Sequence, residues 1–223
     1  MPAESSTQLV ILAKRPKLGA VKTRLAADTG PVEALAIYQQ LLQLQIDHAR
    51  RYARAAPHRH VRIDWDAPSA NGSRTVEERG WLVDGKQGAG SIGDRMGLVM
   101  GQHFSSERRA GDRLIIVGSD CPYLDEQVLA AAEAALDEVD CALVPALDGG
   151  YVLIGVNRHF MTSGCDVFGG MPWSTPELMA ATRERLSQAG VRWAELPPLE
   201  DIDEWPALQR WQAAATDTSP SAS

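Results

Sequence analysis

Short apolar runs with the character of buried strands alternate with segments of helical spacing along most of this 223-residue chain. The clearest strand is the run from Leu114 to Val117, whose uninterrupted apolar sequence is typical of a strand covered on both faces of a sheet. Alternation of this kind predicts an α/β fold with a mainly parallel sheet, in which ligands bind beyond the carboxyl ends of the strands.

The periodicity predicts the following elements. Strands are expected at 9–13, 61–65, 81–83, 114–117, 142–145, 151–156 and 192–196. Helices are expected at 31–54, 94–104 and 125–136, and a fourth is expected to be capped by Ser174 or Thr175 and to end near 189. The segment from Gly85 to Gly93 contains four glycines and is expected to be a loop.

Length and composition fit one domain over residues 8–215, with flexible tails at 1–7 and 216–223. A net charge of −7 and a pI of about 5.2 argue against nucleic acid as a partner. No long apolar run predicts a membrane span and the N-terminus lacks a secretion signal, so a cytoplasmic protein is expected. Three scattered cysteines, without a Cys-x-x-Cys pair, suggest neither a zinc site nor a disulfide framework.

A basic island follows the first expected strand of this acidic chain. Five basic side chains and no acidic one lie between Lys14 and Arg24. A local positive loop at a strand end favours a site for one small anion, most obviously a phosphate, which a glycine would let approach the backbone closely. The alternative is a solvated loop that keeps the neighbouring strand edge soluble. The candidate phosphate-binding residues are Lys14, Gly19, Lys22, Thr23 and Arg24.

Two further features bear on this candidate phosphate site. Arg95, after the glycine-rich segment, either adds positive charge to it or only pairs with Asp94. Neither a P-loop sequence nor a dinucleotide-binding glycine fingerprint follows the first strand, so both of those phosphate-binding motifs are excluded.

Asp120 stands where the buried strand at 114–117 stops, so its carboxylate can project into a crevice. Mg²⁺ and similar hard cations prefer oxygen ligands, commonly one or two carboxylates together with substrate phosphates. Asp120 is therefore the first candidate metal ligand, the alternative being a simple turn residue before Pro122. Asp201, Asp203 and Asp148 compete for the second position.

The competing acidic residues have ordinary explanations as well. Asp201 and Asp203 would point to one side if their tripeptide is extended, or they belong to a solvated acidic loop or a helix cap. The Asp148-Gly149-Gly150 turn either lets a base, sugar or acceptor lie against the backbone or is a plain hairpin connection. A Cys121–His nucleophilic pair is disfavoured, because this cysteine is more simply a small packing residue.

The order of six motifs resembles the bacterial family called radical-SAM/selenodomain-associated transferase 1, over about residues 8–205. The motifs are Ala13-Lys14-x-Pro16-x-x-Gly19-x-Val21-Lys22-Thr23-Arg24-Leu25, Gly93-Asp94-Arg95-Met96, Gly118-Ser119-Asp120-Cys121-Pro122, Asp148-Gly149-Gly150-Tyr151, Trp173-Ser174-Thr175 and Asp201-Ile202-Asp203. The resemblance implies a single-domain glycosyltransferase A-type fold, a Rossmann-like three-layer sandwich with a mainly parallel mixed sheet, in the nucleotide-diphospho-sugar transferase superfamily.

A more distant similarity to 2-phospho-lactate guanylyltransferases concerns mechanism. It implies Lys22 and Arg24 on the triphosphate, and Asp120 with Asp203 or Asp201 on Mg²⁺. It also implies that the turn at 148–150 lies near the base or the acceptor. Where the family usually has a threonine after the late Asp-x-Asp, this chain has Glu204.

The leading hypothesis is thus a transferase dependent on Mg²⁺ or Mn²⁺ that moves a nucleotidyl group from an NTP to a small phosphorylated or acidic acceptor, with Lys22, Arg24 and Asp120 as catalytic residues. The alternative is a glycosyltransferase that uses a nucleotide-diphospho-sugar. A third is a catalytically inactive nucleotide-binding protein, which the retention of both acidic and basic groups disfavours.

Overall fold

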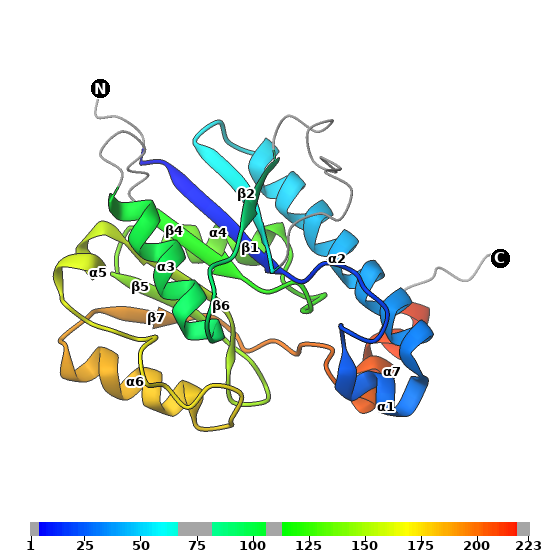
Figure 1. Cartoon of the computed structure of the whole chain (residues 1–223). Coiled ribbons are helices and arrows are strands. Elements are labelled where there is room, and N and C mark those ends of the chain that lie inside the picture. Colours follow the sequence, from blue (N-terminus) through cyan, green and yellow to red (C-terminus); the bar gives the residue numbers. More distant parts are fainter. Residues whose placement is uncertain (1–4, 67–81, 106–112, 218–223) are drawn as a thin grey trace.

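The structure is a computed structural model of the chain and describes residues 5–66, 82–105 and 113–217. A seven-stranded sheet runs through its centre in the order β3-β2-β1-β4-β6-β5-β7 (Figure 1). The strands are β1 (Thr7–Ala13), β2 (Arg59–Trp65), β3 (Leu82–Lys86), β4 (Arg113–Val117), β5 (Cys141–Pro145), β6 (Tyr151–Asn157) and β7 (Trp193–Glu195). Every expected strand is found, although Trp81, the first residue of the third one, lies outside the described residues. The predicted α/β fold is confirmed.

Seven helices are present among the described residues. They are α1 (Thr23–Thr29), α2 (Pro31–Arg54), α3 (Ile92–Ser105), α4 (Glu126–Ala135), α5 (Arg158–Thr162), α6 (Leu178–Gln188) and α7 (Trp205–Asp217). Asp125 caps α4 as predicted, since its side chain accepts hydrogen bonds from the backbone N–H groups of Gln127 and Val128. The helices α1, α5 and α7 have no counterpart among the predicted elements.

The two predicted tails lie mostly outside the described residues, which leave out 1–4 and 218–223. Regular elements extend a short way into both described parts of these tails. β1 begins at Thr7, and α7 extends through Asp217, two residues into the expected C-terminal tail.

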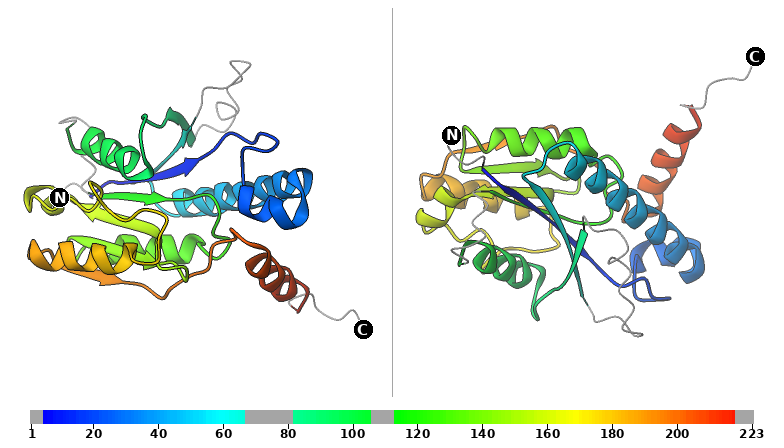
Figure 2. Two further views of the ribbon diagram at one scale, coloured as in Figure 1. Left: turned by 60° about the horizontal axis from the view of Figure 1, so that its bottom comes forward. Right: turned by 90° about the horizontal axis from the view of Figure 1, so that it is seen from above.

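Side chains of the central strands alternate between two apolar layers. Leu9 and Ile11 of β1 pack in one core cluster with residues of α2 and α4. Val10 and Leu12 pack in a second cluster with residues of α3 and α6. Figure 2 shows helices on both sides of the sheet, so the molecule has the three layers that a strand buried on both faces requires.

The strand directions bring the chemically interesting loops to one edge of the sheet. β1 is parallel to β2 and β4, β2 to β3, and β5 to β7, whereas β6 is antiparallel to its neighbours β4 and β5. The carboxyl ends of all strands except β6 therefore meet at one edge. The hairpin that joins β5 to β6 turns at this same edge and carries Asp148 with it.

The expected glycine-rich loop is shorter than predicted. Gly85 and Lys86 belong to β3, where they pair with Asp64 and Trp65 of β2. Gly93 lies in α3, where a side chain would collide with Trp173 and the carbonyl of Phe168. Close packing, and not loop flexibility, explains these glycines at either end of the segment.

The predicted cap of α6 is wrong. The helix begins at Leu178 with Glu177 at its N-cap and no side-chain cap hydrogen bond. The hydroxyl of Thr175 donates instead to the carbonyl of Pro172 at 2.9 Å. An amide of the first turn, that of Met179, donates to the carbonyl of Gly149 at 2.8 Å, so the β5–β6 hairpin satisfies a group that a capping side chain would otherwise serve.

A small third apolar cluster joins the helices beside the strand ends. Leu25 of α1, Leu41 of α2 and Leu208 of α7 pack together with Ile202, which is completely buried. Figure 1 shows α1 and α7 side by side near one end of α2. This cluster fixes the acidic segment around Ile202 at the edge where the strands end.

Candidate functional site

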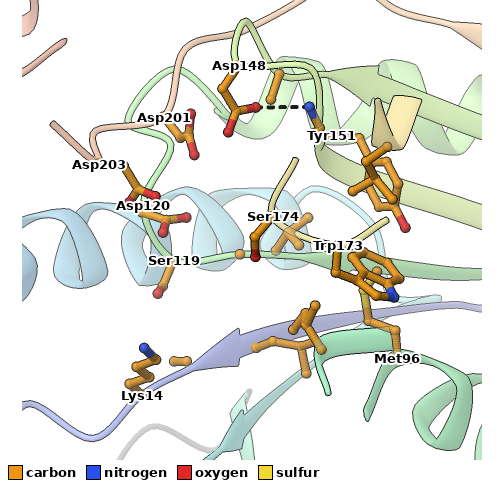
Figure 3. Close-up of a pocket in the computed structure, with 18 of the residues that line it drawn as sticks. Lys14, Met96, Ser119, Asp120, Asp148, Tyr151, Trp173, Ser174, Asp201 and Asp203 are labelled. Carbon is orange, nitrogen blue, oxygen red and sulfur yellow. Dashed lines mark hydrogen bonds between the residues drawn. The ribbon is translucent and has the colours of Figure 1, made fainter. Parts of the chain in front are cut away.

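A cleft of about 650 Å³ opens at the carboxyl edge of the sheet. The ends of β1 and β4, the β5–β6 hairpin, the segment before α6 and the segment before α7 all contribute to it. Figure 3 shows Asp120, Asp148, Asp201 and Asp203 together on one side of the cleft, with Lys14 opposite them. The predicted site residues that line it are Lys14, Lys22, Thr23, Arg24, Arg95, Asp120, Asp148, Gly150, Asp201 and Asp203.

The fold positions Asp120 and the late acidic pair through a shared backbone contact. The N–H of Ile202 donates to the carbonyl of Asp120 at 3.0 Å, which ties the segment before α7 to the end of β4. Because the Ile202 side chain is buried away from solvent, Asp201 and Asp203 on either side of it turn towards the cleft. The expectation that these two carboxylates share one side is confirmed.

Lys22 lies between two of these carboxylates. Its Nζ is 3.0 Å from Oδ2 of Asp120 and 2.6 Å from Oδ1 of Asp203, and its side chain is only 4% exposed. Burial disfavours the charged ammonium, but the two carboxylates outweigh this effect, so the pKa of Lys22 lies above its usual value. The basic loop thus has acidic partners after all, which come from distant parts of the sequence.

The backbone of Lys22 is in the left-handed helical region, with φ 47° and ψ 48°. Among the described residues only Lys22 and Ser174 combine a positive φ with a side chain, and both line the cleft. This conformation costs free energy in a residue with a Cβ. Such strain concentrates where a site needs a side chain in one particular direction.

Asp201 is the carboxyl group most opposed to ionisation. Burial, followed by the negative charges of three neighbouring aspartates, raises its pKa to about 7. These neighbours are Asp120, Asp203 and Asp148. At neutral pH this group is therefore divided between its protonated and charged forms, which limits the electrostatic repulsion within the acidic side of the cleft.

The carboxylate oxygens of the cleft suit a divalent cation whose remaining ligands come from a substrate. The described residues contain no group of three or more potential metal-binding side chains. Two carboxylates nevertheless converge on a single cation, the Lys22 ammonium, which stands where a metal ion would have carboxylate ligands. Two carboxylates are what Mg²⁺ commonly takes from a protein when phosphate oxygens supply further ligands.

The rest of the basic loop divides between the cleft and the surface. Arg24 lines the cleft, but its side chain is 60% exposed and its guanidinium is 4.0 Å from Glu204. Gly19, with φ 74°, does not line the cleft, so its predicted contact with a phosphate has no support from its position. Tyr38 fixes the backbone of Lys14, because the Lys14 N–H donates to the Tyr38 hydroxyl and this hydroxyl donates to the Lys14 carbonyl.

Arg95 does not pair with Asp94. It donates instead to the side-chain oxygen of Gln87 at 3.0 Å and to the carbonyl of Gly90 at 3.1 Å. Gln87 is buried and donates to the carbonyl of Ala13 at 2.9 Å, which links the ends of β1 and β3 to the start of α3. The interpretation of Arg95 as an added positive charge in the cleft fits this arrangement better than an ion pair with its sequence neighbour.

The far end of the cleft is formed by the hairpin and the segment before α6. Asp148 accepts a hydrogen bond from the N–H of Gly150, as in a tight turn, and Gly149 packs directly against the backbone of Pro176. The rings of Tyr151 and Trp173 meet edge to face, with centroids 6.1 Å apart (Figure 3). The turn at 148–150 is thus both a hairpin connection, as the simpler interpretation has it, and part of the cleft.

Several cleft residues have no role that the sequence alone assigns. Tyr38 lies in the middle of an amphipathic helix, where an aromatic residue looks like core, and only the structure shows its hydroxyl between Lys14 and Ser119. Trp173 and Ser174 stand in one of the six motifs, which is the signal that could have found them. Nothing in the local sequence reveals that Ser174 has a positive φ.

Cys121 is confirmed as a packing residue. It is buried in the core, and burial raises the pKa of its thiol to about 12. Its Sγ lies 3.4 Å from the carbonyl oxygen of Glu200. A thiol with this pKa supplies almost no thiolate at neutral pH, so the structure gives no basis for a nucleophilic cysteine.

Solved structures share this fold. That of a candidate nucleotide-diphospho-sugar transferase from Desulfovibrio desulfuricans G20 has a TM-score of 0.80 and 27% identity, over 96% of this chain and 90% of that chain. A 4-diphosphocytidyl-2C-methyl-D-erythritol synthase from Anaerococcus prevotii DSM 20548 has a TM-score of 0.60 and 6% identity, over 95% and 99%. A CMP:2-keto-3-deoxy-manno-octonic acid synthetase complexed with CTP has a TM-score of 0.54 and 16% identity, over 96% and 100%.

The first of these neighbours is named a nucleotide-diphospho-sugar transferase, and the other two, with identities of 16% and 6%, show the fold alone. No curated protein matches the sequence. Among the helices of the described ranges, none combines the length and the apolar character that a membrane span requires. The model of a bacterial protein family matches residues 45–175, which is more than half of the chain. The chain therefore belongs to DUF2064, the uncharacterized proteins conserved in bacteria.

Proposed function

We propose that this protein is a nucleotidyltransferase that uses an NTP together with Mg²⁺ or Mn²⁺. The observation that carries the proposal is the convergence of Asp120 and Asp203 on one cation position in a cleft that also contains Lys14, Arg24 and Arg95. Carboxylates for a metal beside basic groups for phosphates form a charge arrangement suited to a polyphosphate. The fold shared with nucleotidyltransferases supports the same class of reaction.

In this reaction an acceptor oxygen forms a bond to the α-phosphorus while the bond to pyrophosphate breaks, and pyrophosphate leaves. A divalent cation on Asp120 and Asp203 would neutralise charge on the phosphate oxygens. Lys14 and Arg95 would bind the phosphates from the other side and stabilise the charge that develops on the leaving pyrophosphate. An acceptor that is already an anion needs no protein base, whereas a hydroxyl acceptor must lose a proton.

A second candidate is glycosyl transfer from a nucleotide-diphospho-sugar. One specific feature favours it: the lining residues from Gly118 to Asp203 include four aspartates and the aromatic pair Tyr151 and Trp173, but no lysine or arginine. Aromatic faces and carboxylates suit an uncharged polyol better than a phosphorylated or acidic acceptor. The name of the Desulfovibrio protein points to this donor class for that protein.

The two functions leave different products, and a direct assay separates them. The purified protein is incubated with each of the four NTPs and with a panel of nucleotide-diphospho-sugars, each with Mg²⁺ or Mn²⁺. We expect metal-dependent binding of at least one NTP and release of pyrophosphate when an acceptor is present. Binding of a nucleotide-diphospho-sugar with release of a nucleoside diphosphate, and no binding of any NTP, would contradict the proposal and support glycosyl transfer.

The narrower family resemblance and the acceptor remain predictions. The similarity to 2-phospho-lactate guanylyltransferases would favour GTP as the donor, and the same binding measurements test it by comparing the four bases. A catalytically inactive nucleotide-binding protein would bind a nucleotide and release no product from any donor. The presence of four aspartates and four basic side chains in one cleft argues against such a protein.

A further inference from the structure

The cation position between Asp120 and Asp203 is already filled from within the chain. The Nζ atom of Lys22 lies 3.0 Å from one carboxylate oxygen and 2.6 Å from the other, and only 4% of the side chain is exposed. An ammonium and a divalent metal cannot share these two oxygens at such distances. For a metal to bind both carboxylates as proposed above, Lys22 has to leave.

The chain holds Lys22 in this position against two costs. Its charged group is buried, and its backbone has φ 47° and ψ 48°, a conformation unfavourable for a residue with a Cβ. The two ion pairs are the described contacts that offset these costs. A cation that took over the carboxylates would remove this compensation, and both the burial and the backbone strain would then favour release of the lysine.

Charge balance indicates where the Lys22 ammonium goes once it is released. One ammonium leaves a net negative charge on the two carboxylates, whereas a divalent ion neutralises both. Lys22 and its neighbours Thr23 and Arg24 line the same cleft as Lys14 and Arg95, where the proposed function places the phosphates. Lys22 precedes the first residue of α1, so a rotation there moves its side chain without unwinding that helix.

We infer that Lys22 is an internal stand-in cation. It holds Asp120 and Asp203 together in the free protein, gives way when a divalent cation enters, and then brings its positive charge to the donor phosphates. This inference rests on the proposed function, and it assigns Lys22 a positioning role on the acidic side before a binding role on the phosphate side. It follows that the free protein binds divalent cations weakly and that metal and nucleotide bind tightly only together.

The test measures how tightly Mn²⁺ binds to wild type and to two variants, each as the full chain and without nucleotide. Electron paramagnetic resonance quantifies the free Mn²⁺. Lys22→Met removes the charge and keeps a side chain of similar length. Lys17→Met is the matched control, because Lys17 is an exposed lysine of the same loop that does not line the cleft. We expect Lys22→Met to bind Mn²⁺ about tenfold or more tightly than wild type, which is roughly 1.4 kcal/mol, and Lys17→Met to match wild type.

Two outcomes contradict different claims. If wild type and Lys22→Met bind Mn²⁺ equally well, the carboxylates hold a metal without competition from Lys22, and only this inference is overturned. If neither protein binds Mn²⁺, with or without any NTP, the proposed metal-dependent function falls as well. Circular dichroism and thermal unfolding establish that the variants compared are folded.

A second measurement uses the wild type and so does not depend on the folding of a variant. An amine-acylating reagent is applied with and without Mn²⁺ and NTP analogue, and modification of each lysine is quantified by mass spectrometry. We expect Lys22 to be nearly unreactive in the free protein and to become at least several-fold more reactive with Mn²⁺ alone, while Lys17 stays constant. Reactivity of Lys22 that Mn²⁺ leaves unchanged at a concentration that fills the site would overturn the inference.

Discussion

Among single side chains, Asp201 carries the clearest consequence of crowding carboxylates around one cleft. Its ordinary pKa of 3.8 rises to about 7 because the group is buried and near three other aspartates. Because the folded protein opposes the charged form of this group, ionisation of Asp201 lowers the free energy of unfolding, and protonation raises it again. The stabilising contribution of the protonated group is present below about pH 4 and is lost as the pH rises to 7.

We therefore predict that Asp201→Asn gains stability relative to wild type as the pH rises. The asparagine avoids the charge that the folded protein opposes, so the difference in free energy of unfolding should grow by about 2 to 3 kcal/mol between pH 5 and pH 8. Urea unfolding at both pH values, with a chelator present, measures this change. An equal difference at the two pH values would show that the carboxyl group of Asp201 ionises normally in the fold.

The sequence identifies most of these residues but not how they pair. Asp120, Asp203 and Lys22 stand in recognisable motifs, and the short apolar strand before Asp120 already indicates where its carboxylate lies. Contact between Lys22 and the two aspartates spans sequence separations of 98 and 181 residues. Local periodicity contains no information on such contacts, so the sequence alone predicts a phosphate ligand at Lys22 and nothing of its ion pairs.

At the level of elements, the segment before α6 is shaped by the hairpin against which it packs. Gly149 has φ +94°, and a Cβ there would lie 2.6 Å from Cα of Pro176. Strain and collision act together at this position. At the same contact the carbonyl of Gly149 accepts a hydrogen bond from the N–H of Met179 in the first turn of α6. Capping rules that consider only sequence neighbours miss this partner, which explains why they place the helix start too early.

We predict that Gly149→Ala lowers the free energy of unfolding by at least about 2 kcal/mol. Gly190→Ala is the control, because Gly190 also has a positive φ, of +65°, but no atom of the described residues lies within 4 Å of the position that its Cβ would take. The control should cost only the backbone strain, about 1 kcal/mol. Equal losses in chemical denaturation would show that packing against Pro176 adds nothing to the cost of the backbone conformation.

Ser174 provides the opposite case, in which a glycine should help. Its φ of 62° is unfavourable for serine and acceptable for glycine. We predict that Ser174→Gly raises the free energy of unfolding by about 1 kcal/mol relative to Ser174→Ala, which keeps the strain. Urea denaturation of the two variants gives the comparison, and a glycine variant less stable than the alanine variant would refute the strain at this position.

The elements themselves are predictable to the extent that their own residues decide them. The strand at 113–117 and the 24-residue helix α2 have strong apolar patterns, and both lie close to their expected limits. The helices α1 and α7 are different, because their apolar residues become buried only through the cluster that joins Leu25, Ile202 and Leu208. A seven-residue helix supported by a distant partner leaves little periodicity to detect.

For the whole molecule, the sheet topology explains why loops from distant parts of the sequence form one site. Parallel strands place their carboxyl ends together, and the antiparallel β6 turns the Asp148 hairpin towards the same edge. The resulting cleft has basic groups from the first half of the chain and carboxylates from the second half. Alternating strands and helices predict the shared edge, whereas the ion pairs that place Lys22 among the carboxylates emerge only in three dimensions.

The central claim is that this separated charge binds a nucleotide through a divalent cation on Asp120. The most direct test measures Mg²⁺-dependent NTP binding and pyrophosphate release for wild type and Asp120→Asn, with thermal unfolding as the control for folding. We predict that Asp120→Asn stays folded and loses metal-dependent turnover by about 100-fold or more. Unchanged turnover in a folded Asp120→Asn protein would contradict this claim and remove Asp120 from the mechanism.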